Sequence, residues 1–123
     1  MTLAAASLGC AATDVDQPLI SSDAAAAAVS RTLNVRLTEA TTADVPALSD
    51  LVARYSGGDR ENPVLLLVFD SVASPRQVAG GHAHFRGGLS AVTERNVVVM
   101  LGGRGLPRRR AAVTGALRSA AAR

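Results

Sequence analysis

The chain has 123 residues, 48% of them apolar, and contains only three aromatic side chains. This length and composition are typical of one domain with a core built mainly from Ala, Val and Leu. Cys10 is the single cysteine, which excludes an internal disulfide and any metal site that needs several cysteines. No apolar run reaches the roughly 18 residues of a membrane-spanning helix.

The formal net charge of +3 is unevenly distributed along the chain. Residues 1–70 contain four arginines and nine carboxylates, whereas residues 71–123 contain nine arginines and one carboxylate, Glu94. The asymmetry indicates either an anionic ligand for the C-terminal half or two ordinary solvated faces that attract each other within the fold. Aromatic side chains are not interleaved with the arginines, which argues against a nucleic-acid partner.

Residues 1–30 predict a flexible, alanine-rich leader or a loosely docked helix in front of a single domain at 31–123. Ser22-Asp23 would cap a short helix that covers residues 24–29. Small residues precede Cys10 as in a lipoprotein signal, but no basic residue comes before them. We therefore expect a cytoplasmic chain, with a lipid anchor at Cys10 as the alternative if translation starts further upstream.

Residues 33–37 alternate between apolar and polar side chains, which predicts a half-buried strand. A helix is predicted next, because Asp44 offers a cap, Pro46 suits the first turn, and Gly57-Gly58 would end it. Its apolar face would consist of Val45, Leu48, Val52 and Tyr55, which follow one another at spacings of three, four and three residues.

Residues 64–69 and 97–101 are apolar throughout, which predicts two strands buried on both faces of a sheet. A second helix is predicted from Pro75 onward, and a last helix follows the glycines after residue 101. The apolar stripe of the second helix would be Val78, His82, Phe85, Leu89 and Val92, and that of the last helix Leu106, Val113 and Leu117.

Strands and helices thus alternate along the predicted chain. This order favours a small α/β domain of the type βαβαβα, with a mostly parallel sheet and right-handed crossovers. Because three strands make a small sheet, a further strand from residues 11–30 or a partner molecule would complete it.

A glycine-rich turn between a buried strand and a helix is a place where proteins bind phosphate groups. Neither the dinucleotide-binding fingerprint nor the phosphate-binding loop of nucleotide hydrolases is present, so a plain turn is the alternative. The candidate anion-binding residues are Gly102, Gly103, Arg104, Gly105, Arg108, Arg109 and Arg110.

A second candidate site follows the strand at residues 64–69 and consists of Asp70, Ser71 and Ser74. No Gly-x-Ser-x-Gly motif is present and no base is placed beside either serine, so we expect no catalytic triad. His82 and His84 would diverge on a helix and would not share a metal ion. The sequence therefore predicts neither a metal nor a cofactor.

Residues 33–119 resemble the STAS-like domains, the fold of anti-sigma-factor antagonists, and especially small proteins of this type from myxobacteria. The resemblance lies in residues 63–68, in residues 96–102 and in the helix around residues 111–117. Such antagonists carry a phosphorylatable serine after the central strand, in a turn similar to Asp-Ser-Ser-Gly. Ser71 is the nearest match here, although the glycine is absent and Pro75 changes the turn.

The resemblance implies a non-catalytic regulatory module that binds another protein. Its contact surface would include the turn at Asp70-Ser71 and the second predicted helix. An anion- or nucleotide-binding domain that uses residues 102–110 is the alternative. A lipoprotein attached through Cys10 is the third possibility.

Overall fold

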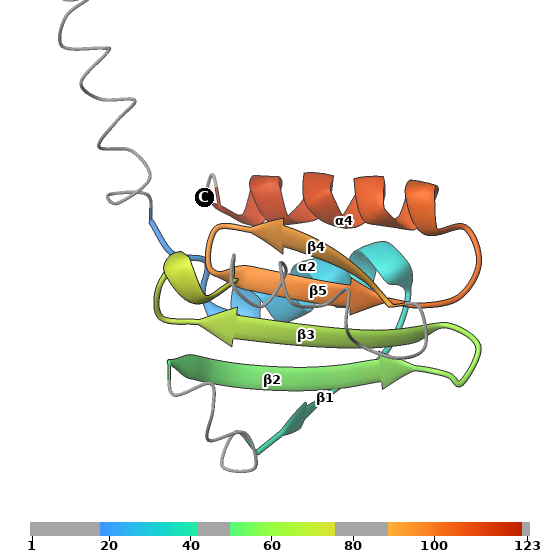
Figure 1. Cartoon of the computed structure of the whole chain (residues 1–123), viewed down its shortest axis with the longest axis horizontal. Coiled ribbons are helices and arrows are strands. Elements are labelled where there is room, and N and C mark those ends of the chain that lie inside the picture. The colour runs from blue at the N-terminus through green and yellow to red at the C-terminus, as the bar shows by residue number, and fades with distance from the viewer. Residues whose placement is uncertain (1–17, 42–49, 76–88, 122–123) are drawn as a thin grey trace, which may run out of the picture.

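The computed structural model describes residues 18–41, 50–75 and 89–121, which form an antiparallel sheet with helices α2 and α4 on one face (Figure 1). The strand order is β1-β2-β3-β5-β4. Helix α2 spans Ser22–Leu33 and α4 spans Leu106–Ala121. The strands are β1 (Leu37–Ala40), β2 (Leu51–Gly58), β3 (Pro63–Phe69), β4 (Ser90–Glu94) and β5 (Val97–Leu101).

The prediction of a mostly parallel βαβαβα sheet is wrong, because every pair of neighbouring strands is antiparallel. Two connections are too short for the crossover that parallel strands require. Residues 59–62 join β2 to β3, and the Asp59 side chain holds this loop by accepting the N–H groups of Glu61 and Asn62 at 2.9 and 2.8 Å. Arg95 and Asn96 alone join β4 to β5, with Arg95 at a φ of +55°.

The helix predicted to end at Gly57-Gly58 is a strand over its described part, because residues 51–58 form β2. Leu51, Ala53 and Tyr55 are buried while Val52 and Ser56 are exposed, which is the alternation of a strand. The described end of the second predicted helix is also a strand, since Val92 lies in β4. The first predicted strand is displaced, because α2 ends at Leu33 and β1 begins at Leu37.

Helix α2 begins earlier and is longer than the sequence pattern predicted. Ser21 is its N-cap and accepts the N–H of Ala24, and Asn34 closes it in the left-handed conformation at a φ of +53°. Ala25 and Val29 are fully buried in the main core. The described part of the predicted leader therefore packs against the core through α2.

The main core lies between the helices and one face of the sheet. Val29 of α2 and Val113 and Leu117 of α4 are fully buried there, against inward-facing side chains of β2, β3, β4 and β5. A smaller cluster on the other face contains Leu51, Leu67, Phe69, Val98 and Met100. Strand β5 is buried at every position, so its predicted burial on both faces is confirmed although its neighbours are antiparallel.

Asn96 is the buried polar residue of the described part of the chain, with 1% of its surface exposed. Its side-chain oxygen accepts the N–H of Ile20 at 2.8 Å. Its amide nitrogen donates to the carbonyl oxygens of Ile20 at 2.9 Å and Phe69 at 2.8 Å. The β4–β5 turn is thereby fastened to the end of β3 and to the segment that leads into α2, where Arg95 also donates to the carbonyl of Pro18 at 3.0 Å.

Candidate functional site

The predicted site residues lie at opposite ends of the sheet and do not form one site. Strands β3 and β5 are antiparallel, with Val68 opposite Val97 and Val64 opposite Leu101. Asp70 therefore follows β3 at one end, whereas Gly102 follows β5 at the other end (Figure 1). In a parallel sheet both would have met at the same edge.

At the first end, two predicted serines converge on a carboxylate that the sequence analysis missed. Ser71 Oγ donates to Asp50 Oδ2 at 3.0 Å, and Ser74 Oγ donates to the same oxygen. The backbone N–H of Asp70 donates to the carbonyl of Asp50 at 3.0 Å. Asp50 precedes β2, and the pairing of Leu51 with Phe69 brings it beside the exit of β3. The position of Asp50 beside the two serines could have been predicted only if the β2–β3 hairpin had been recognised in the sequence.

The serine contacts determine the electrostatics of this cluster. The hydrogen bond from Ser74 is the main cause that lowers the pKa of Asp50 below its ordinary value of 3.8. Partial burial acts in the opposite direction, and the bond from Ser71 adds to the lowering of the pKa. A carboxylate with a lowered pKa is a weak base, so it does not remove a proton from either serine.

Asp50 therefore acts as an anchor for the segment that follows β3. Its side chain binds the hydroxyl groups of Ser71 and Ser74, and its backbone binds Asp70. These contacts connect residues 70–74 to the start of β2 while the Asp70 side chain stays exposed. The arrangement presents a carboxylate on a rigid support and contains no nucleophile–base pair among these residues.

At the second end, the predicted glycine turn holds the sheet and α4 together. Gly103 and Gly105 both have positive φ angles, of +97° and +67°. The N–H of Gly102 donates to the carbonyl of Pro63 at 3.1 Å, and the N–H of Arg104 donates to Asn62 Oδ1 at 3.2 Å. These two N–H groups are therefore used by the start of β3 and by the β2–β3 loop, and they are not left for a phosphate.

The four arginines of the predicted anion site have different roles. Arg109 donates to the carbonyl oxygens of Gly102 at 2.6 Å and Arg104 at 3.3 Å, so its guanidinium closes the turn. Arg110 reaches the carbonyl of Ala91 on β4 at 3.4 Å. The side chains of Arg104 and Arg108 are exposed and project from this end. A shallow hollow of about 430 Å³ beside Arg104 is also lined by Glu61, whose carboxylate disfavours an anion there.

The described residues place no three His, Cys, Asp or Glu side chains where they would hold a metal ion. His82, His84 and Cys10 lie outside residues 18–41, 50–75 and 89–121. Within those ranges, no helix has both the length and the apolar character needed to cross a bilayer.

Comparison with protein-family models, with curated proteins and with solved structures finds no match to this chain. The resemblance to STAS-like domains therefore stays a prediction. The parallel sheet that accompanied it is the part that the fold corrects.

Proposed function

We propose that this chain is a non-catalytic module that binds another protein, and that the surface around Asp70 is part of its contact region. The observation that carries the proposal is the double hydrogen bond from Ser71 and Ser74 to Asp50. It holds a loop at the end of the sheet in one conformation before any partner arrives. A preformed loop loses less conformational entropy on binding, which leaves more of the contact energy for affinity.

The same cluster argues against an enzyme that uses these serines. Both hydroxyl groups donate to a carboxylate whose pKa is lowered, and a nucleophilic serine needs a neighbouring group that accepts its proton. The exposed groups beside the cluster are those of a contact surface. They comprise the Asp70 carboxylate and the Val52 side chain, of which 54% is exposed. A charged group next to an apolar one is a common composition for the rim of a protein interface.

Site-specific photo-crosslinking in cells of the source organism tests this proposal. A benzoylphenylalanine introduced in place of Asp70 is expected to give a discrete crosslinked band, because a partner would cover this position. The matched control carries the same photoreactive residue in place of Gly115, which is also exposed but lies in the middle of α4, away from both ends of the sheet.

A band at position 70 that is absent at position 115 would support the proposal. Equal labelling at both positions would mean non-specific contact and would contradict it. The absence of any band at position 70, with the variant folded and present at the normal level, would also contradict it. The molecular mass of the crosslinked product gives the size of the partner, whether that partner is a different protein or a second copy of this chain.

A further inference from the structure

The end of the sheet that carries the glycine turn is basic. The C-terminus of β2 and the N-terminus of β3 meet there, as do the segment before β1 and the start of α4. Asp59 and Glu61 are the described carboxylates at this end, and the Asp59 side chain is occupied by two backbone N–H groups. The described arginines at this end include Arg36, Arg60, Arg104, Arg108 and Arg109, of which all but Arg109 are exposed.

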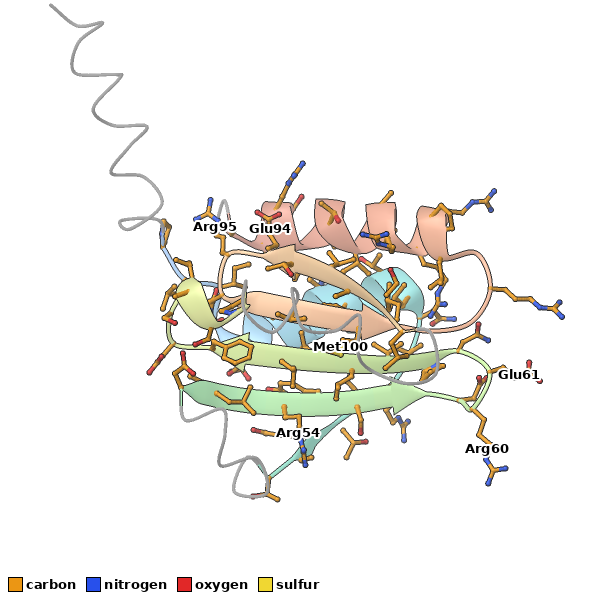
Figure 2. The ribbon with its side chains drawn as sticks, in the orientation of Figure 1. Arg54, Arg60, Glu61, Glu94, Arg95 and Met100 are labelled. Atoms are coloured by element: carbon orange, nitrogen blue, oxygen red, sulfur yellow. The ribbon has the colours of Figure 1, made fainter. Side chains whose placement is uncertain are left out.

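The opposite end is acidic. It contains the N-termini of α2, β2 and β5 and the C-termini of β3 and β4. Arg118 and Arg95 lie there too, but Arg118 is paired with Glu94 at 3.2 Å and Arg95 is bound to the carbonyl of Pro18. The described carboxylates at this end are Asp23, Asp50, Asp70 and Glu94, and Figure 2 shows Glu94 and Arg95 far from Arg60 and Glu61.

We propose that the partner of the Asp70 surface is the basic end of a second copy of this chain. This inference rests on the proposed function, since it names the partner for the same surface. Among the described residues the two ends carry opposite net charge, and their exposed groups are complementary: the Asp70 and Asp23 carboxylates on one copy would face Arg104 and Arg108 on the next. Opposed potentials of this kind fix the orientation of two molecules and raise the rate at which they meet.

The position of the two ends determines the type of assembly. A contact between different surfaces of identical molecules is heterologous, and it produces open chains unless the rotation between copies closes a ring. Because the basic and acidic surfaces lie at opposite ends of the sheet, each copy keeps one free end after association. The contacts are between exposed charges, so the association is expected to be weak and sensitive to salt.

Two charge-reversal variants of the full chain make this proposal testable. In Arg104→Glu/Arg108→Glu the basic end becomes acidic, and in Asp23→Arg/Asp70→Arg the acidic end becomes basic. Each variant alone then carries like charges at both ends. The folded state of each is checked by thermal unfolding, because reversing Asp23 places a positive charge in the first turn of α2, where the helix dipole favours a negative one.

Sedimentation velocity at about 20 mM and about 500 mM NaCl gives the outcome, since the Debye length shortens several-fold between these conditions. Wild type is expected to associate at low salt, with a mass that keeps rising with concentration. Its association is expected to be at least about tenfold weaker at high salt. Each variant alone is expected to be monomeric at low salt. An equimolar mixture of the two variants is expected to associate, because their ends are again complementary.

A wild-type chain that stays monomeric at low salt would overturn this proposal, as would a closed dimer that persists at high salt. A mixture that fails to associate, with both variants folded, would do the same. None of these results refutes the proposed function. If position 70 still crosslinks to a different protein while the chain is monomeric, the contact surface is retained and only the identity of the partner changes.

Discussion

Replacing Asn96 by alanine is expected to lower the free energy of unfolding by at least about 3 kcal/mol. The substitution leaves the N–H of Ile20 and the carbonyl oxygens of Ile20 and Phe69 without the partner that each has now. A buried polar group without a partner costs about 1–3 kcal/mol. The loss is a large fraction of the 5–15 kcal/mol that is typical of a domain. Urea unfolding followed by circular dichroism measures it.

Two further variants at asparagine positions identify the cause of this loss of unfolding free energy. Asn34→Gly is expected to change the unfolding free energy by less than about 1 kcal/mol, because glycine suits the left-handed conformation at this helix end. Asn96→Asp keeps an acceptor for the Ile20 N–H but turns a carboxylate oxygen toward two carbonyl oxygens, so it should be nearly as damaging as the alanine. A loss below about 1 kcal/mol for Asn96→Ala would show that the Ile20 segment is not held by this side chain.

Gly103→Ala is expected to cost about 3 kcal/mol or more, whereas Gly105→Ala should cost only about 1 kcal/mol. Both glycines have positive φ angles, so both substitutions strain the backbone. They differ in the space for a methyl group. At Gly103 a Cβ would overlap the side-chain oxygen of Asn62 and the carbonyl oxygen of Glu61, but at Gly105 the nearest atom, Cδ of Arg109, is 4.0 Å away.

The difference in unfolding free energy between these two alanine variants measures the contribution of the close contact between the glycine turn and the β2–β3 loop. Their unfolding midpoints in urea, compared at equal m-values, give it directly. Equal losses for the two variants would mean that only the backbone conformation matters. In that case the contact between Arg104 and Asn62 contributes nothing to the attachment of α4.

Strands β3 and β5 and helix α4 were predictable because their signals are local. Continuous apolar runs at residues 64–69 and 97–101 fit strands buried on both faces, and Pro107 near the start of α4 fits the first turn of a helix. The direction of the strands was not predictable from that pattern. Once helices or other segments cover both faces of a strand, its sequence is an apolar run in a parallel sheet and in an antiparallel sheet alike.

Strand β2 shows why the topology was predicted incorrectly. Val52 and Tyr55 are three residues apart and fit a helix face, whereas Leu51, Ala53 and Tyr55 fit a strand equally well. Reading this segment as a helix hid the β2–β3 hairpin and the Asp59 side chain that holds its loop. The same error separated Asp50 from Ser71 and Ser74, because a contact across 21 residues depends on the strand register.

The two candidate sites were predicted in part. Asp70, Ser71 and Ser74 do lie together, but their position beside Asp50 comes from the pairing of β2 with β3. The glycine turn lies where it was predicted, and the N–H of Gly102 donates there to the carbonyl of Pro63. The role of Arg109 in closing the turn was hidden, because a run of arginines does not indicate which of them point inward.

The pKa of Asp50, measured by following its side-chain carboxyl ¹³C signal through an acid titration, tests the central claim that this carboxylate is an ionised anchor. We predict a pKa below the ordinary value of 3.8, raised by Ser74→Ala and raised less by Ser71→Ala. The anchor is then present above pH 4 and is lost as the pH falls through the folded-state pKa. A pKa at or above 3.8 that neither substitution changes would contradict the account, because Asp50 would then be free of the serines.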